Sequence, residues 1–171
     1  DWLAILGASY FRTSGYSGQF GLSARGIAID SGGPGPEEFP RFSKFWLEQA
    51  PEGGIVIHAL LEGPRVTGAY RLDTRHQPGK GVFQTIDADI FLRGDIERLG
   101  IAPLTSMFWY GKNNRFVGPD WRPEIHDSDG LEMLLATGER IWRPLNNPPR
   151  VMANAFGAQS VGRGGYNDLD L

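Results

Sequence analysis

VFQTIDADIFL, residues 82–92, places apolar side chains at alternate positions along the chain. In an extended strand every second side chain points to the same face. One face therefore carries the apolar residues Val82, Ile86, Ala88, Ile90 and Leu92. The other face carries the polar residues Thr85, Asp87 and Asp89. A period of two with one apolar face is typical of a half-buried strand in an antiparallel sheet, which is the structure we expect here.

The segments on either side of this strand show the same preference. Ile55–Leu61 and Arg65–Asp73 flank Glu62-Gly63-Pro64, a combination that predicts a hairpin turn. Four further segments are predicted to be strands: Phe20–Asp30, Leu104–Tyr110, Leu131–Ala136 and Arg140–Leu145. Thr137-Gly138-Glu139 is expected to form a tight connection between the last two of these strands.

Two segments are predicted to form short helical turns. Phe39–Glu48 spaces Phe39, Phe42 and Trp46 at three and four residues, and Gly94–Gly100 could wind once before its final glycine. The 24 Gly and 12 Pro residues favour many turns and short elements. The predicted fold class is therefore all-β, an antiparallel β-sandwich with long loops and few short helical turns.

Length and composition exclude several classes of protein. A chain of 171 residues is the size of one domain. A net charge of -3 without a basic stripe argues against a nucleic-acid partner, and no apolar run reaches the 18 residues of a membrane span. The absence of cysteine excludes a disulfide scaffold, a thiolate nucleophile and a thiolate zinc site. Oligomeric state is left open.

The two ends of the chain lead to two expectations. The chain begins at Asp1 without a methionine or a signal peptide, so we expect it to start within a longer protein or after processing. The Gly-rich segment 157–171 is predicted to be an irregular tail.

The segment RPEIHDSDGL, from Arg122 to Leu131, holds three carboxylates, a histidine and an arginine. Aromatic residues precede it in MFWYG (107–111) and follow it in IWRPLNNP (141–148). Carboxylates supply acid–base chemistry and flat rings stack on sugar faces, so the combination indicates a carbohydrate site. The alternative is an ordinary turn in which Asp127 and Asp129 accept hydrogen bonds from backbone amides.

Several residues near this segment are candidate sugar contacts. The aromatic candidates are Trp109, Tyr110, Trp121 and Trp142, and we expect at least one of them to be buried in the core instead. Arg122 and Arg143 each precede a proline, and either could bind hydroxyls or grip a carboxylate with its forked guanidinium. Glu124 is the acid nearest Asp127 on its N-terminal side, and His126 either orients Asp127, binds a hydroxyl or is purely structural.

A second group of acids surrounds the Gly-Pro loop 31–36. Asp30, Glu37 and Glu38 could supply a second carboxylate for catalysis, but the sequence slightly favours a solvated loop. His58 lies in an apolar strand and is predicted to be structural, whereas His76 is predicted to be exposed. No spacing of ligands indicates a metal site, and no other cofactor is predicted.

Six ordered segments, over about residues 3–156, resemble the periplasmic glucan biosynthesis proteins G and D of Gram-negative bacteria. The segments are LGASYFR (6–12), GLSARGIAID (21–30), EEFPRFSKFW (37–46), APLTSMFWYG (102–111), RPEIHDSDGL (122–131) and GERIWRPLNNP (138–148). The resemblance implies a large N-terminal β-sandwich domain with a long groove, followed by a smaller immunoglobulin-like domain. Residues 1–156 would belong to the large domain, and the immunoglobulin-like domain would be absent from this chain.

The resemblance also implies a function in the periplasm. The D-type protein is similar to inverting β-1,2-glucan hydrolases, and the family's general acid falls on Asp127. Glu124, His126, Trp109, Tyr110, Trp121, Arg122 and Trp142 would then contact a β-1,2-linked glucan. A non-catalytic module that presents glucan backbones to other enzymes of the pathway is the alternative. A third possibility is a folding fragment with neither activity.

Overall fold

The computed structural model describes residues 2–20, 23–50, 53–105, 107–118, 120–146 and 158–164, the last of these by backbone alone. The chain divides into two compact units, Asp1–Thr105 and Ser106–Leu171, which are described separately. The described residues form β-strands in antiparallel sheets, with a 3-10 helix as the longest helical element. This confirms the predicted all-β class.

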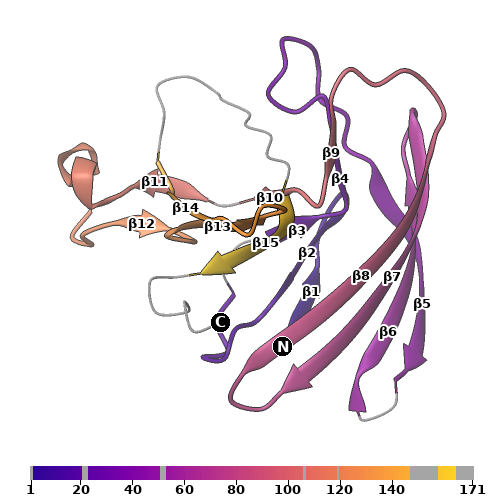
Figure 1. The fold of residues 1–171 in the computed structure, drawn as a ribbon, viewed down its shortest axis with the longest axis horizontal. Helices are drawn as coiled ribbons and strands as arrows, with labels where there is room; N and C mark the ends of the chain where they lie inside the picture. Colours follow the sequence, from indigo (N-terminus) through magenta and orange to yellow (C-terminus); the bar gives the residue numbers. More distant parts are fainter. Residues whose placement is uncertain are drawn as a thin grey trace. The chain divides into compact units, whose positions relative to one another are not determined.

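Unit 1 contains three antiparallel sheets (Figure 1). The first has the order β1-β2-β3-β10, formed by Leu3–Ile5, Tyr10–Thr13, Ser23–Arg25 and Leu104–Thr105. The second pairs β4 (Ile27–Ile29) with β9 (Leu99–Ile101). The third has the order β5-β6-β7-β8, formed by Arg41–Gln49, Ile55–Glu62, Val66–Gln77 and Gly81–Leu92. The predicted strand 20–30 is thus two strands, β3 and β4, which are separated at Gly26.

The core of unit 1 lies between β2–β4 on one side and the third sheet on the other. Alternation in β7 buries Val66, Tyr70 and Leu72, while the residues between them are more exposed. These side chains join one buried cluster with Phe11, Ala24, Ile27, Ile29, Ile57, Ala59 and Leu61. Packing of two sheets face to face around such a cluster is the arrangement of a β-sandwich. The predicted hairpin at Glu62-Gly63-Pro64 is confirmed as the β6–β7 turn.

The strand predicted at residues 82–92 is confirmed as β8, which pairs with β7 along its whole length. Its apolar face is less buried than the sequence suggests. Val82 and Ile90 are half-buried, whereas Ile86 is 41% and Leu92 is 57% exposed. The reason is its position, because β8 is an edge strand of its sheet within unit 1.

The helical turn predicted at Phe39–Glu48 is wrong, since Arg41–Gln49 form strand β5. The register of β5 against β6 shifts between Phe42 and Lys44, which marks a β-bulge. A bulge adds one residue to one strand. Phe42 and Phe45 therefore reach the same face although they are three positions apart, and their rings lie 5.9 Å apart. The predicted helix face of Phe39, Phe42 and Trp46 does not form, since Phe42 lies opposite Leu61 and Trp46 lies opposite His58 on the other side of the sheet.

The helical turn predicted at Gly94–Gly100 is also absent. Residues 94–98 form bends and irregular backbone, and Leu99–Ile101 form strand β9. The Arg98 N–H donates to an Asp30 carboxylate oxygen at 2.9 Å, and the Asp30 N–H donates to the Arg98 carbonyl at 2.9 Å. Pairing with β4 therefore satisfies the backbone groups that a helical turn would have used.

Unit 2 is built from short strands. Strand β11 (Phe108–Tyr110) pairs with β12 (Ile125–His126), and the 3-10 helix η2 (Lys112–Val117) lies between them in the chain. Another sheet has the order β14-β13-β15, formed by Arg140–Pro144, Gly130–Leu135 and Ala158–Gly164. The single strand predicted at residues 104–110 is thus two strands, β10 and β11. The segment from residue 157 was expected to be an irregular tail, but its residues Ala158–Gly164 form strand β15, whose backbone pairs with β13.

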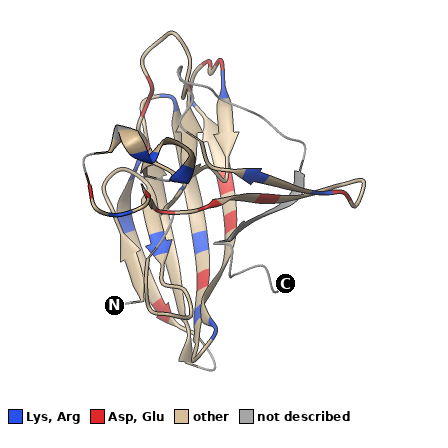
Figure 2. Cartoon of the chain, turned by 90° about the vertical axis from the view of Figure 1, so that its left-hand side faces the viewer, with Lys and Arg blue, Asp and Glu red and all other residues tan. Residues whose placement is uncertain are grey.

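The tight connection predicted at Thr137-Gly138-Glu139 is confirmed as the β13–β14 turn. The Leu135 N–H donates to the Glu139 carbonyl at 2.9 Å, and Gly138 has a φ of 86°. A positive φ strains residues with a Cβ atom, so glycine suits this position. In Figure 2 acidic and basic residues are interspersed along the strands. Across the described ranges, no helix is long and apolar enough to cross a membrane.

Candidate functional site

The candidate catalytic residue Asp127 follows strand β12 in unit 2 and is exposed. Its N–H donates to the Met107 carbonyl at 2.9 Å, and its Oδ2 accepts the Met107 N–H at 3.3 Å. The β11–β12 pairing thus continues through Asp127 and fixes its backbone. The bond to its carboxylate is long, and no ion pair holds this carboxylate among the described residues. Asp127 is therefore anchored by its main chain while its side chain faces solvent.

The neighbouring residue His126 is the centre of a polar network. Its Nε2 lies 3.0 Å from Glu124 Oε2, and its Nδ1 lies 3.7 Å from Asp129 Oδ1. Nδ1 is buried without a hydrogen bond in the described structure. The imidazole stacks on Phe108 with ring centroids 5.6 Å apart. His126 is thus held by a hydrogen bond at Nε2 and by stacking on one ring face, which favours an orienting role for the segment that carries Asp127.

A pocket of about 280 Å³ lies beside this network within unit 2. It is lined by Phe108, Gly111, Lys112, Asn113, Glu124, His126, Asp129, Pro144 and Leu145. Lys112 Nζ lies 3.3 Å from Glu124 Oε1, so a cation and an imidazole both contact the same carboxylate. The pocket is therefore lined by a cationic donor (Lys112), by carboxylate acceptors and by the aromatic ring of Phe108.

The pKa of Glu124 lies below its ordinary value, mainly because the His126 imidazole donates a hydrogen bond to it and then because Lys112 lies nearby. Glu124 is therefore ionised at neutral pH. A carboxylate held in this state accepts hydrogen bonds but does not donate a proton. Glu124 is therefore a poor candidate for a proton donor.

The lowered pKa of Glu124 predicts a pH dependence of stability. A carboxyl group whose pKa is lower in the folded state stabilises the fold above its unfolded pKa, and that contribution is lost as the pH falls through the folded pKa. Glu124→Gln should therefore lower the free energy of unfolding at pH 7, and the difference from the parent should shrink towards pH 3. Urea unfolding at both pH values measures it, and an equal difference at both would contradict the ion-pair role.

The four aromatic candidates differ in exposure. Trp121 is 85% and Trp109 is 46% exposed, so both present a face to solvent. Tyr110 is fully buried, and its hydroxyl donates to the Arg122 carbonyl at 3.0 Å. It is therefore a core residue, in line with the expectation that at least one of the four rings is buried, and its ring has no exposed face in the described structure. Trp142 is half-buried.

Arg122 forms an ion pair with Asp120, a residue that is not among the candidates predicted from the sequence. Its Nε lies 2.9 Å from Asp120 Oδ1, its Nη2 lies 2.6 Å from Oδ2, and its N–H also donates to Oδ1 at 3.0 Å. These contacts lower the pKa of Asp120 to about 2, because the guanidinium stabilises the charged form. Of the two roles left open for the arginines, hydroxyl binding or a forked pair with a carboxylate, Arg122 forms the forked pair. The two-residue spacing of Asp120 from Arg122 was the available signal.

The acids around the Gly-Pro loop lie in unit 1 and are held by arginines. Asp30 Oδ2 and Glu38 Oε2 each lie 2.7 Å from Arg65, whose Nη1 and Nε they contact. Glu37 is paired with the buried Arg25 and accepts a hydrogen bond from the Ser31 hydroxyl. The pKa of Asp30 is lowered, first by the Arg98 N–H and then by Arg65. They line a pocket of about 430 Å³, but their pairing favours a structural role.

The two remaining histidines lie in unit 1. His76 is exposed, as predicted, and its ring stacks on Trp2 at a centroid distance of 6.1 Å. His58 belongs to the apolar strand β6 but points away from the core, and its Nε2 lies 3.4 Å from Glu48 Oε2. Within the described parts of the chain, no group of His, Cys, Asp and Glu is arranged to hold a metal ion.

Comparison with known proteins supports the resemblance noted from the sequence. The chain is 54% identical over 160 residues to glucans biosynthesis protein D 2 of Ralstonia nicotianae. It is 55% identical over 158 residues to the probable glucans biosynthesis protein D of Shewanella oneidensis, and 51% identical over 158 residues to glucans biosynthesis protein D of Xylella fastidiosa. Each alignment covers 91% of this chain and 29% of the relative, so the chain spans less than a third of their length.

The family described as "Periplasmic glucan biosynthesis protein, MdoG" matches residues 1–166. The match includes both units and every candidate residue discussed above. The family description places its members in the periplasm and gives them a role in glucan biosynthesis. On this match, the chain belongs to the MdoG family of periplasmic glucan biosynthesis proteins.

Proposed function

We propose that the complete protein containing this chain binds β-1,2-glucan and hydrolyses it with Asp127 as general acid. The observation that carries the proposal is the contrast between Asp127 and its acidic neighbours. Glu124 is held by His126 and Lys112, whereas Asp127 is exposed with only a long amide contact to its carboxylate. A general acid must reach the leaving oxygen, and a side chain that faces solvent meets this requirement.

An inverting hydrolase also needs a base, about 6.5–9.5 Å from the acid, to activate water on the opposite face of the sugar. Asp30 and Glu38 are poor choices, because each has both carboxylate oxygens in contact with arginine groups. Glu124 is tied to His126 and Lys112. We therefore propose Asp127 as the acid and assign no residue as the base.

Binding without catalysis is the second candidate function. It is favoured by the two exposed tryptophans of unit 2, since Trp109 and Trp121 could stack on sugar rings without any acid. Such a protein would present glucan backbones to other enzymes. The two candidates agree on the ligand and differ only in whether Asp127 transfers a proton.

The direct test is incubation of the complete protein with linear β-1,2-glucan. Hydrolysis is followed by the appearance of new reducing ends, and proton NMR identifies the first anomer released. An inverting reaction releases the α-anomer from a β-linkage. Tight binding without new reducing ends would establish the binding function instead. If the protein neither bound nor cleaved the glucan, both candidate functions would be excluded.

Trp109→Ala and Trp121→Ala should each weaken β-1,2-glucan binding by about 1–3 kcal/mol, because each removes an exposed ring that can stack on a sugar. Calorimetry on the folded complete protein measures the change. Phe116→Ala is a suitable control, since Phe116 is an 88% exposed ring of the same unit that is not a sugar candidate. Affinity that is unchanged in both tryptophan variants would exclude these rings from the site.

A further inference from the structure

One face of the third sheet of unit 1 points away from the core and carries a row of functional groups. Strand register aligns Trp46 with His58, His58 with Arg71, and Arg71 with Asp87. Residues opposite each other in neighbouring strands share a face, so these four side chains cross the sheet from β5 to β8. We call this surface the outer face. The alternate residues Ala59, Tyr70 and Leu72 point into the core.

Large aromatic side chains are exposed on the outer face. Trp46 is 55% exposed, and Phe83 and Phe91, which register places opposite Arg75 and Thr67 of the same face, are 51% and 60% exposed. A solvent-facing sheet surface normally carries polar residues, so exposed rings among charged groups indicate an interaction surface. Trp46 at one end of the row offers the largest ring for stacking.

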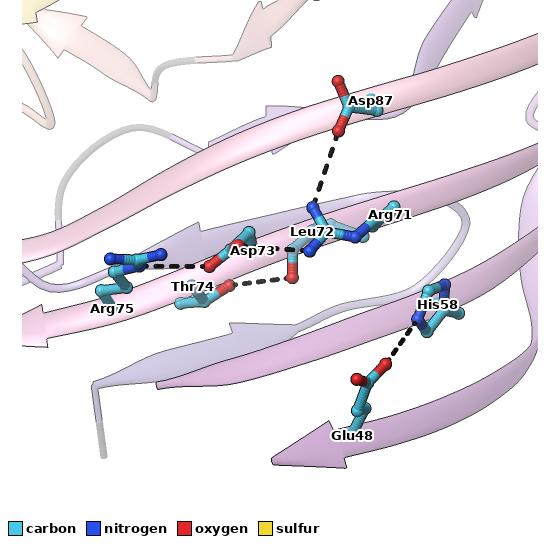
Figure 3. Close-up of polar contacts among 8 residues, drawn as sticks. All are labelled: Glu48, His58, Arg71, Leu72, Asp73, Thr74, Arg75 and Asp87. Carbon is cyan, nitrogen blue, oxygen red and sulfur yellow. Dashed lines mark hydrogen bonds and ion pairs between the residues drawn. The ribbon is translucent and has the colours of Figure 1, made fainter. Parts of the chain in front are cut away.

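Six titratable groups of the outer face are paired with each other, as Figure 3 shows. Arg71 lies 3.3 Å from Asp73 and 3.7 Å from Asp87, and Arg75 lies 3.4 Å from Asp73. His58 lies 3.4 Å from Glu48. These distances exceed the 2.7–2.9 Å or so of strong charged hydrogen bonds. The groups are thus held in place but retain hydrogen-bonding capacity.

The balance of charge restricts the ligand. Strand register places five carboxylates on this face (Glu48, Glu62, Asp73, Asp87 and Asp89) together with four cations (Arg41, Lys44, Arg71 and Arg75) and the His58 imidazole, so neither sign dominates. A polyanion would meet the carboxylates and a polycation the guanidinium groups. A sugar hydroxyl both donates and accepts hydrogen bonds, so it can pair with either kind of group. The face therefore suits a neutral polyhydroxylated chain.

We propose that the outer face of the β5–β8 sheet is a glucan-binding surface separate in sequence from the Asp127 segment. Trp46 stacks on one sugar ring, while Arg71, Asp87 and His58 bind the hydroxyls of the units that follow across the strands. The choice of glucan as the neutral chain rests on the proposed function. The aromatic and paired-charge pattern of the surface is independent of it.

The test uses the complete protein carrying Asp127→Asn, so that ligand is not consumed, and calorimetry with linear β-1,2-glucan oligosaccharides. Trp46→Ala in this background should weaken binding about tenfold, as expected for loss of a central aromatic contact. Trp46→Phe should retain most of the affinity, because a flat ring remains. Arg71→Met, which keeps the apolar stem of the side chain, should weaken binding severalfold.

Leu47→Ala provides the matched control. Leu47 is the next residue of β5, is 69% exposed and points to the opposite face. Its variant should bind like the parent. If Trp46→Ala and Arg71→Met bind like Leu47→Ala, this inference is overturned while the proposed function stands. If the parent itself binds no glucan, both fail together. If Trp46→Ala loses thermal stability but keeps full affinity for glucan, another part of the protein covers the outer face. That result would also overturn the inference.

Discussion

Asp127→Asn should lower the rate of β-1,2-glucan hydrolysis by the complete protein about 10²–10⁴-fold, the usual contribution of a general acid. Asparagine keeps the size of the side chain and its capacity to accept the Met107 N–H, so the backbone of this segment should be unchanged. It cannot donate a proton to the leaving oxygen. The loss should therefore fall on kcat while glucan affinity remains nearly that of the parent.

Asp129→Asn is the matched control for this experiment. Asp129 lies two residues away, carries the same carboxylate and is 3.7 Å from His126 Nδ1, so its loss should affect stability more than rate. Rates are measured by reducing-end release under saturating glucan, with thermal unfolding as the check of folding. Hydrolysis by Asp127→Asn at the parent rate would refute the catalytic assignment, and the glucan-binding function would replace it.

Leu61→Ala should lower the free energy of unfolding by about 2–5 kcal/mol, the range for truncation of a buried leucine. Leu61 belongs to β6, is 0% exposed and points into the buried cluster of unit 1. Removing its side chain loses the transfer free energy of three carbons and leaves a cavity that a close-packed sandwich fills only in part. Urea unfolding of the complete protein, followed by tryptophan fluorescence, measures the effect.

Leu60→Ala is the control for this substitution, because Leu60 is the neighbouring residue of β6 on the opposite, half-buried face. Its loss of stability should be clearly smaller, since less apolar surface returns to water. Equal losses for the two variants would mean that the sandwich core does not lie on the Leu61 side of the sheet.

Local pattern was sufficient for several elements of the fold. Alternation in residues 82–92 predicted β8, and Glu62-Gly63-Pro64 predicted the β6–β7 hairpin, because a strand's period and a turn's chemistry are encoded within a few residues. Alternation could not predict how deeply β8 is buried. That depends on which strands lie beside it, and β8 lies at the edge of its sheet within unit 1.

The error at β5 has a specific physical cause. Phe39, Phe42 and Trp46 have the spacing of a helix face, but in β5 Phe42 lies opposite Leu61 on the core side of the sheet and Trp46 lies opposite His58 on the other side. Pairing with β6 decided between the two conformations. The hydrogen bonds of that pairing join residues far apart in the chain, so no local window contains the information.

At the candidate site, the sequence by itself determined which chemical groups stand together: Glu124, His126 and Asp127 are close because they are adjacent in the chain. Only the tertiary structure decided which carboxylates are held in ion pairs. Lys112 and His126 hold Glu124, and Arg65 holds Asp30 and Glu38 from 35 and 27 residues away. It also decided that Tyr110 is buried and that Trp46, His58, Arg71 and Asp87 form one row. Burial and ion pairing depend on strand register and on packing between strands, and these are set by contacts distant in sequence.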